Sequence, residues 1–197
     1  VRVLQQAGSV VLPDEQICPV QLRLACAPHV AAEREGRRID RAQLNAGAQR
    51  LARLADCVVV EGAGGLCVPL GDDWDSADLM ADLGLPVILA VGMRLGCTNH
   101  AVRTAESVRA RGLRLAGWVA NSVQPSMAFL DENLQTLHAL MLQRFQAPYL
   151  GVVPHLAVPT ADALVGHLDA MALQQIFIPD REFSDLPSGS PMLRMNP

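Results

Sequence analysis

Short, nearly continuous apolar runs recur along the chain, separated by segments with helical spacing. The runs cover residues 57–60, 87–91, 115–120 and 149–153 and are rich in Val, Leu and Ala. Such runs are typical of strands buried on both faces of a parallel sheet. We therefore predict four strands.

Three intervening segments, residues 41–54, 99–111 and 127–145, have the periodicity of helices. The apolar stripes of the first and third are Leu44, Ala48, Leu51, Leu54 and Leu130, Leu134, Leu137, Met141. Strands that alternate with helices form right-handed βαβ units. The pattern predicts an α/β fold with a doubly wound, mostly parallel sheet.

The length of 197 residues indicates one domain, which we place at residues 1–178, followed by an irregular tail at 179–197. Half of the residues are hydrophobic and 18% are charged, as in a chain with a well-buried core. A net charge of −4 argues against a nucleic-acid partner. The longest apolar stretch, residues 83–91, is far shorter than the ~20 residues of a membrane span, so we expect no membrane partner.

The five cysteines form neither a CxxC pair nor a cluster with zinc-like spacing. Cys57 and Cys67 lie in apolar runs, so we expect them to be buried as small hydrophobic residues. An odd number of cysteines without a secretory signal favours a reducing compartment, and we expect a cytoplasmic protein.

The first candidate site follows the predicted strand at residues 57–60. Glu61 is a lone carboxylate, and Gly62, Ala63, Gly64 and Gly65 follow it. Ligands of open α/β sheets bind beyond the carboxyl ends of strands, where a carboxylate can hold Mg²⁺ beside phosphate oxygens. The alternative is a tight turn with a solvated glutamate.

The second and third candidate sites follow the strands at 87–91 and 115–120. Thr98 or Asn99 could cap a helix whose free N–H groups would attract a phosphate or a carboxylate. Asn121 ends the other strand, and its amide can both donate to and accept from the edge of an adenine. An ordinary helix cap and an ordinary turn are the alternatives.

The histidines at 100, 138 and 155 are separated and lack a serine or cysteine partner in any familiar nucleophile motif. We expect them to be structural.

Four blocks resemble dethiobiotin synthetases, in the family's order and at near-family spacing. They are VVVEGAGGLCVPL (58–70), LGLPVILAVGMRLGCTNHAVRTAE (83–106), LAGWVANSV (115–123) and YLGVVPHL (149–156). The segments APH (27–29) and EGRRID (35–40) match more loosely. The resemblance covers roughly residues 1 to 165 and implies a sheet of the P-loop NTPase type.

The resemblance also implies an activity: closure of a ureido ring from 7,8-diaminononanoate, CO₂ and Mg-ATP. A carbamate forms, ATP phosphorylates it, and the second amine displaces phosphate. Members of the family are homodimers whose substrate site lies near the subunit interface.

Site residues are implied in the same way. Glu61 would bind Mg²⁺, and the residues along the nucleotide would be Glu61, Gly62, Ala63, Gly64, Asn121, Ser122, Pro154, His155 and Leu156. The substrate's carboxylate would be received by Gly96, Cys97, Thr98 and Asn99.

The chain departs from the family at both ends. The family's P-loop resembles GTDTxVGKT and is followed by a KP pair and a metal-binding Asp. This chain contains none of these three elements, and all 16 of its basic residues are arginine. Val1 aligns just after that Asp, so we expect an N-terminally truncated domain that lacks the first strand, the P-loop and the helix after it. We expect no catalytic lysine and no activity from this chain alone. Residues 176–197 resemble nothing in the family.

Two alternatives stay open. The chain could be a non-catalytic remnant or binding module with the same half-fold, or another P-loop relative such as a partitioning-type ATPase. The joint presence of GMRLGCTNHA and LAGWVAN weighs against the latter. An in-frame GxxxxGK[ST] in the DNA upstream would favour the enzyme.

Overall fold

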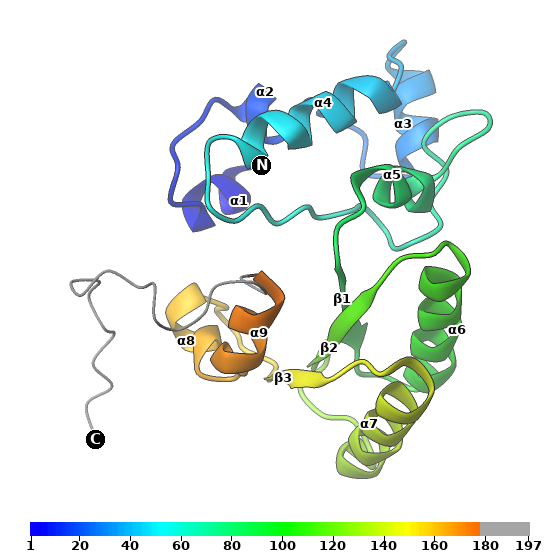
Figure 1. Cartoon of the computed structure of the whole chain (residues 1–197), viewed down its shortest axis with the longest axis vertical. Helices are drawn as coiled ribbons and strands as arrows, with labels where there is room; N and C mark the ends of the chain where they lie inside the picture. The colour runs from blue at the N-terminus through cyan, green and yellow to red at the C-terminus, as the bar shows by residue number, and fades with distance from the viewer. Residues whose placement is uncertain (178–197) are drawn as a thin grey trace.

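A computed structural model describes residues 1–177, and its centre is a parallel sheet of three strands. The strands β1 (Val87–Gly92), β2 (Leu115–Asn121) and β3 (Tyr149–Val153) lie in the order β1-β2-β3 (Figure 1). The three strands predicted in these regions are therefore confirmed. The predicted irregular tail at 179–197 lies outside the described residues.

Helices α6 (Cys97–Ala110) and α7 (Leu130–Phe145) connect the strands as two βαβ units. Both helices were predicted, but α6 begins two residues earlier and α7 three residues later than expected. The stripe on α7 does face the core, since Leu137 and Met141 are fully buried.

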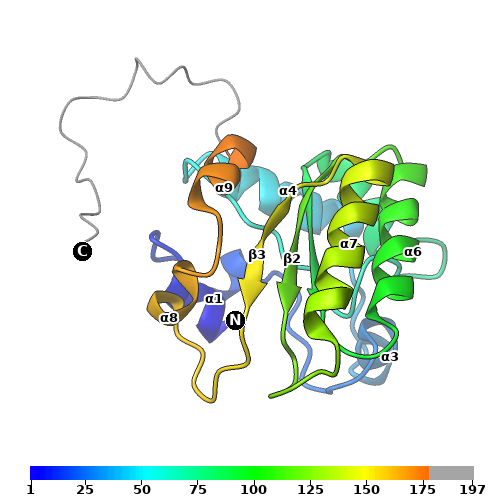
Figure 2. The ribbon, with the colours of Figure 1, turned by 90° about the horizontal axis from the view of Figure 1, so that it is seen from below.

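Helices cover both faces of the sheet, as Figure 2 shows for α6 and α7 on one side and α9 (Ala170–Phe177) on the other. On the first face, Trp118 packs with residues of α6 and α7. On the second, Ala116 and Leu150 pack with Ile176 of α9. Burial of apolar side chains on both faces explains the near-continuous apolar strands. The predicted doubly wound α/β fold is confirmed.

The N-terminal part forms a helical layer beyond the β1 edge of the sheet (Figure 1). Its helices are α1 (Arg2–Ala7), α2 (Asp14–Ile17), α3 (Pro28–Arg34), α4 (Arg41–Ala52) and α5 (Ser76–Leu83); α8 (Ala161–Val165) follows β3. The predicted helix at 41–54 is confirmed as α4, which Asp40 caps by accepting from two backbone N–H groups. Leu54 lies beyond its end and is half exposed. None of the helices in residues 1–177 has both the length and the apolar character needed to cross a bilayer.

The strand predicted at residues 57–60 is wrong. The segment has no regular secondary structure, and Val59 and Val60 are exposed. A run of four apolar residues becomes a strand only when a neighbouring strand satisfies its backbone, and none of the three strands pairs with it. The residues of this segment alone do not show whether a neighbouring strand pairs with it.

The prediction that Cys57 and Cys67 are buried is also wrong, because both are exposed. Each lies in the irregular chain between α4 and α5, where apolar neighbours in sequence do not become neighbours in a core. Cys97, at the start of α6, is the buried cysteine.

Candidate functional site

The carboxyl ends of the three strands lie side by side. Gly92 pairs with Asn121, and Asn121 pairs with Val153. The Met93 N–H donates to the Asn121 carbonyl at 2.7 Å, and the Ser122 N–H donates to the Val153 carbonyl at 2.9 Å. Asn121, Ser122 and Pro154 therefore share one edge, where ligands of such sheets bind.

The side chains at this edge are accessible. Asn121 and His155 are exposed, and Ser122, Pro154 and Leu156 are half-buried. The edge thus offers an amide, a hydroxyl and apolar surface, which together could contact a flat heteroaromatic ring.

Helix α6 begins at the same edge of the sheet, a few residues after β1. Its N-cap is Gly96, with φ of 89°, and no side chain caps the helix. The predicted caps Thr98 and Asn99 are therefore wrong. Gly96, directly before Cys97, turns the chain into α6 in a left-handed conformation that glycine adopts without strain. The N–H groups of Thr98 and Asn99 lie in the first turn, where they have no intrahelical partner. An anion could bind there.

Glu61 does not stand at the end of a strand, which corrects the first predicted site. It is exposed and makes no hydrogen bond or ion pair with other residues of 1–177. The loop that it opens, residues 61–65, lies against α5 instead, where a Cβ on Gly62 would come 3.3 Å from Met80 Cε. Glu61 therefore lies in an exposed loop and not at the end of a strand of the sheet.

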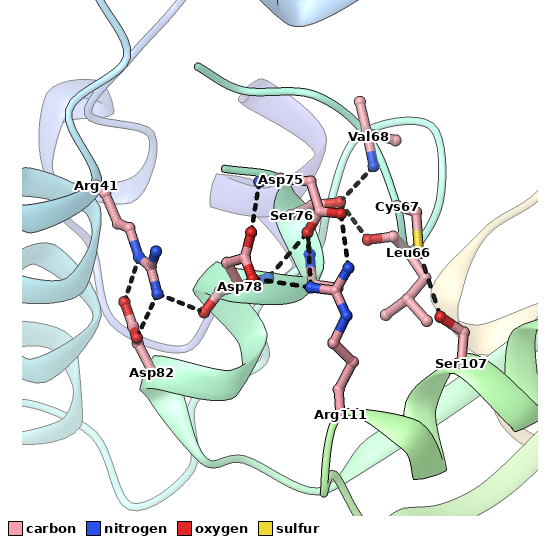
Figure 3. A network of polar contacts seen from close by, with 11 residues as sticks. Arg41, Leu66, Cys67, Val68, Asp75, Ser76, Asp78, Asp82, Ser107 and Arg111 are labelled. Atoms are coloured by element: carbon pink, nitrogen blue, oxygen red, sulfur yellow. Dashed lines mark hydrogen bonds and ion pairs between the residues drawn. The ribbon is translucent and has the colours of Figure 1, made fainter. Parts of the chain in front are cut away.

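Ser76, at the first position of α5, binds the end of this loop (Figure 3). Its hydroxyl lies 2.5 Å from the Leu66 carbonyl and 3.2 Å from the Gly65 carbonyl, and it accepts from the Val68 N–H at 3.0 Å. The Ser76 N–H also donates to the Val68 carbonyl at 2.9 Å. Ser76 is 4% exposed, the one buried polar side chain in the described part of the chain. This contact was not among the sequence-based predictions.

The start of α5 is a capping box. Asp75 accepts from the Ala77 and Asp78 N–H groups, and the Asp78 carboxylate accepts from the Asp75 N–H at 2.8 Å. The sequence Asp-Ser-Ala-Asp before an apolar residue carries this signal, so the helix could have been predicted.

Arg111, which follows the last residue of α6, binds this capping box. Its guanidinium donates to Asp75 at 3.1 and 2.9 Å and to Asp78 at 2.9 Å. The hydrogen bond from Arg111 is the main reason that the pKa of Asp75 lies below its usual value, and the same pair raises the pKa of Arg111. A charge-assisted fork therefore joins α6 to α5.

A second arginine binds the other end of α5 (Figure 3). Arg41, the first residue of α4, donates to both carboxylate oxygens of Asp82 at 2.6 Å. This pairing, with a further bond from Asn45, lowers the pKa of Asp82. The Arg41 guanidinium also lies 5.9 Å from the ring centre of Trp74. Helix α5 is thus attached by ion pairs at both ends.

Residues 1–177 contain no group of three or more His, Cys, Asp or Glu side chains that could form a complete metal site. One free carboxylate nevertheless fits Mg²⁺, because this ion keeps several water ligands and binds through one or two carboxylates together with substrate phosphates. Glu61 is the residue in the loop that could serve. Among the histidines, His138 lies edge-on to Tyr149, with ring centres 6.0 Å apart, and His100 and His155 are exposed.

Comparison with known proteins identifies the family. A family model with the description "AAA domain" matches residues 4–162. The chain is 49% identical over 170 residues to a protein named ATP-dependent dethiobiotin synthetase BioD from Janthinobacterium sp. (strain Marseille); the match covers 86% of this chain and 70% of that protein. It is 53% identical over 154 residues to a protein of the same name from Aromatoleum aromaticum, covering 78% and 67% of the two chains.

These matches include the carboxyl ends of all three strands, the loop at residues 61–65 and the start of α6. With the parallel sheet and its two layers of helices, they show that the chain belongs to the dethiobiotin synthetase family, whose α/β fold is of the P-loop NTPase type.

Proposed function

We propose that the chain is the metal-, adenine- and carboxylate-binding part of an ATP-dependent cyclo-ligase of biotin biosynthesis. The reaction closes a ureido ring from 7,8-diaminononanoate, CO₂ and Mg-ATP. One observation carries this proposal: Asn121, Ser122, Pro154 and the start of α6 lie at the carboxyl edge of one parallel sheet. We also propose that residues 1–178 form one domain of a cytoplasmic homodimer.

Glu61 and the loop residues Gly62, Ala63 and Gly64 are assigned to the nucleotide. Glu61 is exposed and unpaired within residues 1–177, so its carboxylate is available to a cation. When bound, Mg²⁺ neutralises phosphate charge during phosphoryl transfer. Gly64, with φ of 81°, lets the backbone turn where a side chain would strain it.

The adenine is assigned to the edge formed by β2 and β3. The Asn121 side chain can accept from the exocyclic amine and donate to a ring nitrogen. Ser122, Pro154, His155 and Leu156 supply the surrounding polar and apolar surface.

The carboxylate of the diamine substrate is assigned to Gly96, Cys97, Thr98 and Asn99. Two N–H groups of the first turn are free for an anion, and the positive end of the helix dipole favours the same charge. The backbone makes this contact, so the assignment does not depend on the Thr98 or Asn99 side chains acting as caps.

Calorimetric titration of the chain with Mg-ATP and Mg-GTP tests the nucleotide assignment. We expect preference for Mg-ATP, and we expect Asn121→Leu to reduce that preference because guanine presents a different pattern of donors and acceptors. Asn133→Leu is the matched control, since Asn133 of α7 bonds the carbonyl of Phe129, the N-cap of that helix, outside the proposed site. Equal affinities for the two nucleotides, or an unchanged preference in Asn121→Leu, would contradict the assignment.

A further inference from the structure

We propose that Ser76 positions the loop at residues 61–65 and that Arg111 fixes Ser76 from the end of α6. The role of that loop in binding Mg-nucleotide rests on the proposed function. Neither residue belongs to the sites assigned above, and neither is expected to touch a ligand. Both are positioning residues.

Ser76 is buried, and its hydroxyl is fully hydrogen-bonded. A hydroxyl in a buried place is costly unless its donor and acceptor capacities are both used. Ser76 donates toward the Leu66 carbonyl and accepts from the Val68 N–H, so both capacities are satisfied by the chain immediately after the loop. An alanine here would leave the Val68 N–H without its partner.

The loop at residues 61–65 has few other attachments within the described residues. Residues 61–65 are all exposed, and residues 61–66 have no regular secondary structure. An irregular, exposed segment opens readily unless specific bonds hold it. The four bonds to Ser76 involve the last residue of the loop and the residues just after it. The chain then pairs with the start of α5 through the bridge between Pro69 and Asp75.

Arg111 restrains the segment around Ser76. It binds both Asp75, directly before Ser76, and Asp78, two residues after it. Arg111 also follows α6, whose first turn is the proposed carboxylate site. The contact therefore sets the loop relative to the helix that receives the substrate, and a planar five-donor guanidinium suits two carboxylates better than an ammonium does.

Hydrogen–deuterium exchange of the 197-residue chain without nucleotide tests the proposal. In Ser76→Ala, we expect the amides of Val68, Leu70 and Gly71, which are hydrogen-bonded where the loop rejoins α5, to exchange about tenfold faster or more, because the Val68 N–H loses a buried acceptor. Arg111→Gln should speed exchange in the same segment, and Arg111→Lys should have a smaller effect. Ser76→Thr, which keeps the hydroxyl, should restore slow exchange.

Two controls distinguish local from general effects. Thr136→Ala removes a hydroxyl that bonds the Glu132 carbonyl in α7, and Arg38→Gln removes an exposed arginine that has no ion pair within residues 1–177. Neither should change exchange of the Val68, Leu70 and Gly71 amides. Unchanged exchange there in Ser76→Ala or Arg111→Gln, or an equal rise along the whole chain, would overturn the proposal.

A second arm repeats the exchange with increasing Mg-ATP. Protection of residues 61–65 should require several-fold more Mg-ATP in Ser76→Ala than in the parent chain, with recovery in Ser76→Thr. If Mg-ATP protects no residue even in the parent, the proposed function fails. The exchange measured without nucleotide still decides whether Ser76 holds the loop.

Discussion

Arg111 and Asp75 meet in a two-pronged contact, with Nη1–Oδ1 at 3.1 Å and Nη2–Oδ2 at 2.9 Å. Both side chains are partly shielded from solvent. The residues lie 36 positions apart in sequence and join the end of α6 to the start of α5.

This contact predicts a pH dependence of stability. The pKa of Asp75 is lower in the folded chain than the ~3.9 of an unfolded aspartate, chiefly through its bond to Arg111. The stabilisation is therefore present above about pH 4 and is lost as the pH falls through the folded pKa. Urea unfolding from pH 7 to pH 3 should show a smaller acid-induced loss of stability in Arg111→Gln than in the parent.

Arg38→Gln is the control for this measurement, because it removes an exposed arginine without an ion pair in residues 1–177. It should follow the parent's pH dependence. If the free energy of unfolding fell equally with pH in Arg111→Gln and in the parent, the ion pair between Arg111 and Asp75 would contribute nothing to the pH dependence of stability.

Leu137 tests the packing of α7 on the sheet. It is fully buried in the cluster around Trp118, so Leu137→Ala should lower the free energy of unfolding by about 2–5 kcal/mol. Leu142→Ala, on the same helix but half exposed, should cost clearly less. Similar losses in the two variants, measured by chemical denaturation, would contradict the assignment of α7's buried stripe.

Gly96 tests the left-handed turn at the start of α6. Nothing lies within 4 Å of a Cβ at this position, so the cost of Gly96→Ala comes from its φ of 89° and should be about 1–2 kcal/mol. Gly166 also has open space but a right-handed helical backbone, and Gly166→Ala should stabilise the chain by about 0.4–1 kcal/mol. Denaturation that shows the same sign for both variants would refute this account.

An activity assay tests whether the chain can catalyse the reaction without a P-loop motif or a lysine. The 197 residues contain no lysine and no GxxxxGK[ST], the elements that hold ATP phosphates in P-loop enzymes. The purified chain should form no dethiobiotin from 7,8-diaminononanoate, bicarbonate and Mg-ATP, because arginine does not simply replace a compact ammonium in a phosphate cradle. ATP-dependent product detected by mass spectrometry, absent without the diamine, would disprove this prediction.

The sheet and its connecting helices could be predicted because their signals are local. The apolar run at β2 and the stripe through Leu137 and Met141 each reflect burial along a single element. Residues 57–60 form a similar apolar run. They are not a strand, because a strand also needs a hydrogen-bonded neighbouring strand, which its own residues do not encode.

The contacts around α5 could not be predicted in this way. A capping box is visible in the sequence, but nothing local indicates that Arg111 reaches Asp75 or that Ser76 bonds residues ten and eleven positions before it. Such polar contacts depend on how separate elements are placed, which one sequence does not reveal.

The two tryptophans of the chain occupy different environments, and this gives the protein two built-in optical probes. Trp118 is fully buried in the sheet core, and its Nε1 has no hydrogen-bond partner within residues 1–177. Trp74 lies beside Arg41 directly before the N-cap of α5, and its carbonyl accepts from the Leu70 and Gly71 N–H groups. Emission from Trp118 should be blue-shifted and should report the core, whereas a Trp118→Phe chain should fluoresce from Trp74 alone. Changes around the start of α5 can then be followed separately from unfolding of the sheet.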